Sequence, residues 1–174
     1  KREDHGLEKI TSRSNELDDP IALKQDVFAT DANWVTGIIE ISTSLDQTAI
    51  APGKLSRQWE EGNRNYFSFS VDKAVPFNWY FGSAEYHKET RALHGIETTI
   101  LSDPKHPFNL DNYFDALEKA IDFVNSELNL HPIDQHRIVE IPYYQENFYS
   151  YPNVIAISEK EGWYADMTEI KEQA

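Results

Sequence analysis

Histidines are the residues of this chain whose type would most readily support metal chemistry. A zinc site carried by one helix requires two histidines four residues apart, because both rings then project from the same face. No two of the six have that spacing, and His131 and His136, five apart with Pro132 between them, are interpreted as surface or loop residues. We therefore expect no metal ligand, no catalytic residue and no cofactor within these 174 residues. The six are His5, His87, His94, His106, His131 and His136.

Carboxylates close to histidines would be a second source of a metal or acid–base site. His87 with Glu89 and His94 with Glu97 have suitable residue types, but a chain with 30 acidic residues produces such pairs by chance. The same abundance means that no two carboxylates stand out as the general acid and base of a glycoside hydrolase. A site built from distant histidines would also need supporting hydrogen bonds that no sequence pattern indicates.

Composition excludes several other functions. The chain has no cysteine, so it has no disulfide and no thiolate nucleophile, and it contains neither a G-x-S-x-G motif nor a Gly-rich phosphate loop. A formal charge of -14 repels phosphate backbones, which excludes nucleic acid as a partner. No apolar run approaches the ~18 residues of a membrane helix, so we expect a soluble domain.

Aromatic side chains are numerous, with 9 phenylalanines, 9 tyrosines and 4 tryptophans. Exposed tryptophans could form a platform for stacking sugars. Trp34, Trp59, Trp79 and Trp163 instead occupy positions where a core or sheet-packing aromatic is expected, so we interpret all four as structural.

The first half of the folded part has the pattern of short strands. Apolar residues alternate along residues 33–44 and again along 66–71, which predicts half-buried strands, and Gly62-Asn63 marks a hairpin turn. Pro76 ends the second strand, residues 79–86 predict an aromatic strand, and His94-Gly95 turns the chain into residues 96–101. Close turns between short strands indicate an antiparallel sheet or sandwich.

The pattern changes after Pro104 and Pro107. Residues 110–128 carry the stripe of an amphipathic helix, with Asn109 or Asp111 as N-terminal cap and Asn129 with Pro132 at its end. Residues 137–141 and 154–157 are apolar strands, residues 142–151 an aromatic-rich loop, and residues 159–174 show no reliable periodicity. The sequence thus predicts an α+β fold, in which an antiparallel β-sandwich or saddle portion is followed by a helix and a small mixed sheet.

Three segments together resemble the aminopeptidase N type of zinc metallopeptidase, in the branch fused to ABC-2 type transporter permeases. The match covers residues 33–166, and its order and spacing are more specific than any single motif. The third segment begins at residue 108, runs through the predicted helix and ends with residues 136–144 and 150–159. The matching stretches are 47–55 with Trp59 and 62–67; 77–86; and 108–110, 136–144 and 150–159.

The resemblance implies a domain organisation. Residues 1–32 are a lead-in segment, residues 33–103 resemble the C-terminal part of the family's N-terminal β-saddle, and residues 104–174 resemble the start of its thermolysin-like catalytic domain. In the family, the zinc helix with H-E-x-x-H follows shortly after the part that matches residues 152–166. We therefore expect a fragment that is truncated before the zinc motif, with zinc bound in the parent protein.

One loop of the resemblance bears on substrate recognition. The family's G-x-M-E-N loop holds the free amine of a substrate through its glutamate, and Pro152 stands in that place here. Proline has neither charge nor a backbone donor, so ordinary N-terminal recognition is not expected. Asn153 alone is carried over, as a substrate-binding residue or, with equal weight, as a turn residue before a strand.

The function that follows is a non-catalytic fragment of a metallopeptidase-like hydrolase module, inactive by itself, in a membrane transporter-associated protein. The alternative is a non-enzymatic binding or structural domain that retains the peptidase fold without its chemistry. The expected partners are the remainder of the parent polypeptide, namely its catalytic helical region and membrane permease part, and a peptide substrate of that parent.

Overall fold

A computed structural model of the chain describes residue 6 and residues 33–77, 79–128, 134–145 and 148–164. The chain divides into two compact units, Lys1–Asn33 and Trp34–Ala174, and the helices and strands of the described residues lie in the second. The predicted lead-in segment, apart from Gly6, falls outside the described residues, as does the predicted helix end at Asn129 and Pro132.

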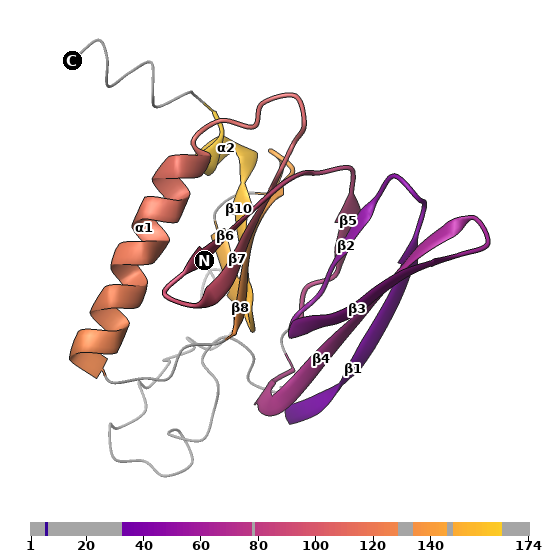
Figure 1. Ribbon diagram of the computed structural model, residues 1–174, viewed down its shortest axis with the longest axis horizontal. Coiled ribbons are helices and arrows are strands. Elements are labelled where there is room, and N and C mark those ends of the chain that lie inside the picture. The colour runs from indigo at the N-terminus through magenta and orange to yellow at the C-terminus, as the bar shows by residue number, and fades with distance from the viewer. Residues whose placement is uncertain (1–5, 7–32, 78, 129–133, 146–147, 165–174) are drawn as a thin grey trace. The chain divides into compact units, whose positions relative to one another are not determined.

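The first part of this unit is a three-stranded antiparallel sheet of order β1-β4-β3 (Figure 1). Its strands are β1 (Trp34–Thr43), β3 (Lys54–Glu61) and β4 (Arg64–Pro76). The alternation along β1, the hairpin turn at Gly62 and the end of β4 at Pro76 confirm the sequence predictions. Two short strands, β2 (Thr48–Ile50) and β5 (Gly82–Ala84), pair with each other beside this sheet.

A five-stranded mixed sheet forms the second part, in the order β6-β7-β8-β10-β9. The central strand β8 is parallel to both β7 and β10, whereas the outer pairs are antiparallel. The α+β fold class is therefore confirmed. The sheet includes strands from both sides of residue 103, where the sequence placed a domain boundary. Its strands are β6 (His87–Leu93), β7 (Ile96–Ser102), β8 (Gln135–Ile141), β9 (Phe148–Tyr151) and β10 (Val154–Ser158).

Helix α1 (Leu110–Phe123) covers one face of the mixed sheet and continues as a π-helical turn, η3 (Val124–Leu128) (Figure 1). Its stripe packs through Leu110 and Phe114 against Ile100 and Ile138 of the sheet. Asn109 precedes the helix with a φ of 64° and makes no side-chain cap; its amide donates instead to the carbonyl of Gly162, at 3.1 Å. The predicted capping role of Asn109 is wrong, because this bond ties the helix start to the segment after β10.

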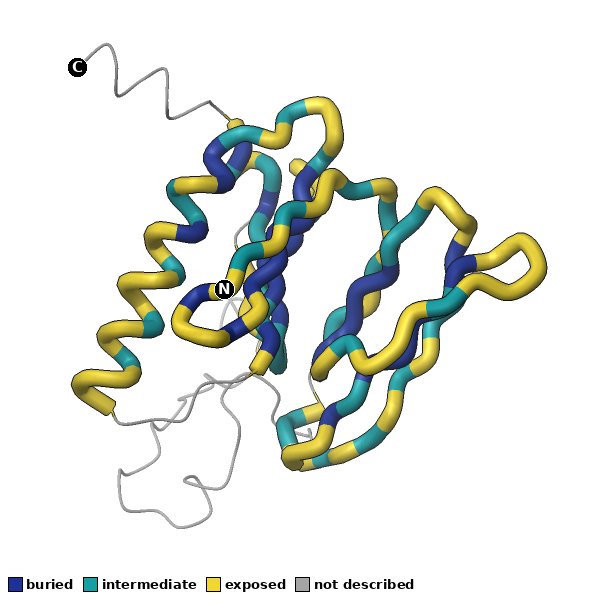
Figure 2. The backbone as a smooth tube through the Cα atoms, viewed as in Figure 1, coloured by how far each residue is buried: buried dark blue, intermediate teal, exposed yellow. Residues whose placement is uncertain are grey.

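The mixed sheet is buried on both faces, as the dark segments of Figure 2 show along its central strands. Ile138 points to the helix side, and its neighbour Val139 points to the opposite side, where Ile50 and Leu101 pack. Successive strand residues face opposite sides, so an apolar run such as that of β8 is what a central strand requires.

Three sequence predictions about aromatic residues are wrong. Of the strand predicted over residues 79–86, Gly82–Ala84 form β5, whereas residues 79–81 form no strand, because Phe77, Trp79 and Phe81 pack ring against ring instead of joining a ladder. The aromatic loop 142–151 contains strand β9, which the sequence pattern did not predict. Trp34 is 68% exposed, so it is not a core residue, although Trp163 is buried as expected.

Candidate functional site

A histidine and three carboxylates meet at one edge of the mixed sheet. The Nε2 atom of His106 lies 3.6 Å from Glu140 Oε1, 3.6 Å from Glu159 Oε1 and 3.9 Å from Asp103 Oδ2. Ligand atoms of His106, Glu140 and Glu159 all lie within 4.8 Å of one another. In the part of the chain that the structure describes, these are the residues that come together in a metal-ligand arrangement.

The sheet topology explains why residues so distant in sequence converge. Strands β7, β8 and β10 run parallel, so their carboxyl ends lie at the same edge. Asp103 and His106 follow β7, Glu140 is next to the last residue of β8, and Glu159 opens the short helix α2 (Glu159–Gly162) directly after β10. The carboxyl ends of parallel strands are where ligand sites of such sheets usually form.

Glu140 is the most buried member, with its side chain 6% exposed. Burial raises the pKa of its carboxyl above the usual value, and the backbone N–H of Asp103, which donates to Glu140 Oε2 at 2.8 Å, opposes that rise together with His106. The neighbouring carboxylates of Asp103 and Glu159 raise the pKa further. The side chain is thus a buried acid held in one orientation and crowded by like charge.

A hollow of about 390 Å³ opens onto this cluster. Its wall includes Asp103, Glu140 and Glu159 together with Tyr80 and Tyr86. Burial raises the pKa of both tyrosines, so their hydroxyls stay protonated and act as neutral hydrogen-bonding groups. The hollow therefore combines fixed acidic groups with an aromatic wall, which suits a polar ligand or a hydrated cation.

The sequence patterns did not indicate the histidine or the three carboxylates of this cluster as site residues, and His106 was treated as one of six histidines without a ligand pattern. The feature that could have identified His106 is its position in the sequence. It lies three residues beyond Asp103, in the connection between a strand and a helix. That signal becomes visible only once β7, β8 and β10 are known to be parallel neighbours.

Asn153 and Pro152, the loop residues from the family resemblance, lie in the turn between β9 and β10. Asn153 has a φ of 64°, its amide donates to the carbonyl of Gln135 at 2.8 Å, and its own carbonyl accepts from the N–H of Arg137 at 2.9 Å. The carbonyl of Pro152 accepts from the N–H of Gly53 at 3.1 Å. Asn153 thus has the turn role that was predicted as one of two options, and its substrate contact stays a prediction.

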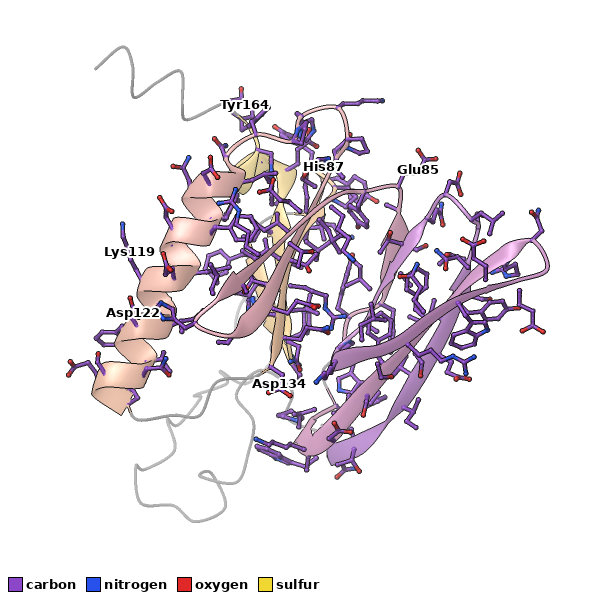
Figure 3. All side chains as sticks on the ribbon, in the orientation of Figure 1. Glu85, His87, Lys119, Asp122, Asp134 and Tyr164 are labelled. Atoms are coloured by element: carbon purple, nitrogen blue, oxygen red, sulfur yellow. The ribbon has the colours of Figure 1, made fainter. Side chains whose placement is uncertain are left out.

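The histidine–carboxylate pairs weighed in the sequence find other partners. Glu89 pairs with Arg91, and Glu97 accepts a hydrogen bond from Gln135 Nε2 at 2.8 Å. His94 Nε2 lies 3.1 Å from Asp122, which Figure 3 labels on α1, and 3.6 Å from Glu118. This second group is more exposed, and it lies on the helix side of the β6–β7 turn.

His136 is not the surface or loop residue that the sequence predicted. It lies within β8, and its Nδ1 atom is buried without a hydrogen-bond partner among the described residues. Burial, followed by the adjacent Arg137 charge, lowers its pKa to about 4 from the ordinary 6.5. The neutral ring is therefore the form that the folded chain stabilises.

Acidification should consequently weaken the fold through His136. Below pH 6.5 the His136 ring becomes protonated in the unfolded chain, whereas in the folded chain it stays neutral until about pH 4. The free energy of unfolding therefore falls as the pH is lowered through this window. The loss due to this residue should be about 2 kcal/mol by pH 5 and about 3 kcal/mol at its limit. Urea unfolding at pH 7 and pH 5 measures it, with His136→Gln as the control that should lose about 2 kcal/mol less between the two pH values. Equal losses in both proteins would contradict the assignment.

Comparison with known proteins bears on the fold as a whole. No protein-family model and no curated protein sequence matches the chain. Among solved structures, the crystal structure of Legionella pneumophila aminopeptidase A in complex with aspartic acid is similar, with a TM-score of 0.66 over 74% of this chain at 14% identity. The fold is distantly aminopeptidase-like. The chain spans 16% of the length of that aminopeptidase.

The likeness agrees with the family resemblance at the level of fold.

No helix among the described residues has the length and apolarity to cross a membrane.

Proposed function

We propose that this chain is a non-catalytic part of a zinc-aminopeptidase-like module, with the peptidase chemistry supplied by other parts of a parent protein. The observation that carries the proposal is the aminopeptidase-like fold over 74% of the chain. The sequence contains no H-E-x-x-H motif, so the zinc ligands and general base of that chemistry are not among these residues.

The turn that holds Asn153 supports a role next to a substrate. It joins β10 to β9, which is one of the two edge strands of the mixed sheet. Asn153 also lies in the wall of a hollow of about 330 Å³ that includes Lys54 and Gln135. We propose that a peptide bound by the parent module passes Asn153, and that the parent is a transporter-associated membrane protein, as the sequence resemblance implies.

Pro152 supports the alternative of a binding or structural domain without peptidase chemistry. It stands where the family's amine-holding glutamate is expected, and its carbonyl accepts a hydrogen bond from the N–H of Gly53, the residue just before β3. A sequence beyond Ala174 that lacks an intact H-E-x-x-H motif would favour this alternative, whereas an intact motif would favour the peptidase.

The purified chain should hydrolyse neither aminoacyl nor internal-peptide fluorogenic substrates. The reason is that the peptidase zinc and its general base are held by an H-E-x-x-H helix, and the sequence contains no such motif. Rates measured with added Zn²⁺ and with EDTA should both equal the background. Turnover that EDTA abolishes would contradict the proposal that this chain is non-catalytic.

A further inference from the structure

We propose that His106, Glu140 and Glu159 form a binding site for a divalent transition-metal cation, Zn²⁺ or Mn²⁺. The donors are one imidazole nitrogen and two carboxylate oxygens at the carboxyl ends of three parallel strands. Mixed nitrogen and oxygen donors suit these ions, whereas Mg²⁺ and Ca²⁺ prefer oxygen ligands alone.

Distances between the donor atoms favour this assignment. Two ligands at about 2.0–2.2 Å from a tetrahedral zinc lie about 3.3–3.5 Å apart. His106 Nε2 lies 3.6 Å from both Glu140 Oε1 and Glu159 Oε1. These two distances exceed the tetrahedral spacing by a few tenths of an ångström, and the donor atoms of all three residues lie within 4.8 Å of one another.

The charge balance of the cluster also favours a cation. Three carboxylates surround one imidazole, and the Glu140 side chain is 6% exposed. A buried carboxylate is costly unless a positive charge or several donors compensate it. One backbone N–H, that of Asp103, donates to Glu140, and a divalent ion would neutralise much of the remaining charge.

The adjacent hollow gives an ion access and room for water. Glu140, Glu159 and Asp103 form part of its wall, so an ion bound by the two glutamates would lie next to a space of about 390 Å³. Water from that space would complete the coordination, and Asp103 Oδ2, 3.9 Å from His106 Nε2, is placed to accept a hydrogen bond from such a water.

The expected affinity is moderate. His106 Nδ1 is buried and makes no hydrogen bond to the described residues, whereas histidine ligands usually donate from that atom to a supporting acceptor. Lack of this support costs about 10–100-fold in affinity relative to a site that has it. The inference departs from the sequence-based expectation of no metal ligand, which considered helical spacing and not the edge of a parallel sheet.

Calorimetric titration of the 174-residue chain with Zn²⁺, together with the electron paramagnetic resonance signal of Mn²⁺, tests the site. One ion should bind per chain, and Mg²⁺ and Ca²⁺ should bind at least about tenfold more weakly. Glu159→Gln and His106→Gln should each weaken binding by about tenfold or more. Glu159 is 39% exposed and partly solvated, so this variant should fold, which its unfolding midpoint would verify.

His94→Gln is the matched control, because His94 also lies within 4 Å of two carboxylates, those of Glu118 and Asp122. That group is exposed and should contribute little, so the control should bind within about twofold of the unmodified chain. Binding that survives in both Glu159→Gln and His106→Gln, binding that is lost in His94→Gln, or no binding below about 1 mM would overturn the proposal.

Discussion

Replacing Arg137 by alanine should lower the free energy of unfolding by about 3 kcal/mol, whereas replacing it by methionine should change it by less than about 1 kcal/mol. Arg137 lies on β8, is 6% exposed, and donates through Nη2 to the carbonyls of Ala51, at 3.0 Å, and Gly53. Its guanidinium also lies 4.9 Å from the ring of Phe69. The side chain thereby connects the mixed sheet to the residues that precede β3.

Two opposing terms decide the size of each effect. Burial lowers the pKa of Arg137 to about 10, so keeping it charged in the fold costs about 3 kcal/mol, and its Nε and Nη1 atoms find no partner among the described residues. Its hydrogen bonds from a charged donor return about 1.5–3 kcal/mol each. Methionine removes both the cost of the buried charge and the gain from the hydrogen bonds, and it fills most of the volume of the arginine. Alanine removes the same two contributions and also leaves a cavity beside Phe69.

Urea unfolding of the two variants at pH 7 measures the difference, and fluorescence and circular dichroism should give the same midpoint. Equal destabilisation by alanine and methionine would show that the two hydrogen bonds, and not the volume, account for the contribution of Arg137. A stabilised methionine variant would show that the buried charge costs more than its bonds return.

Local patterns were sufficient for much of the fold. The alternation of β1, the apolar runs of β8 and β10 and the stripe of α1 are each dictated by which face of one element is buried, and each was predictable from the sequence. The hairpin turns were predictable for the same reason, because their residues lie next to one another in the chain.

The pairing of β7 with β8 was not predictable in this way. Parallel strands need a crossover, and α1 provides it, so β7, α1 and β8 form a strand–helix–strand unit across residue 103. The sequence placed a domain boundary at that residue because the pattern changes from strands to a helix there. A change of pattern marks a change of element, but it does not show which strands will share a sheet.

The candidate site depends on the same non-local information. Glu140 sits inside an apolar strand and Glu159 begins an acidic stretch, so neither stands out among 30 acidic residues. Their meeting with His106 follows from the register of β8 and β10, which pairs Ile141 with Ser158. Asn153, by contrast, lies in a turn, which was one of the two roles that the sequence predicted for it, because turn chemistry is local.

Gly53→Ala should destabilise the fold by about 3 kcal/mol or more, the other large effect expected in this chain. Gly53 has a φ of 87°, a conformation that residues with a Cβ rarely adopt. A Cβ at this position would overlap the backbone carbonyl of Ser70 and the side chain of Val71 on the neighbouring strand β4. Because a backbone atom cannot turn aside as a flexible side chain can, one of the two strands would have to move.

Movement at Gly53 would also disturb the connection between the two sheets. Its N–H donates to the Pro152 carbonyl and its own carbonyl accepts from Arg137, so a shift weakens both hydrogen bonds. Gly62→Ala is the matched control: Gly62 has a φ of 60°, but a Cβ there would meet nothing within 4 Å. Alanine at position 62 should therefore lower the free energy of unfolding only by the cost of a positive φ for a residue with a Cβ, about 1 kcal/mol. If urea midpoints show equal losses for the two variants, the clash with β4 is absent, and close packing of the Gly53 turn against β4 would have to be abandoned.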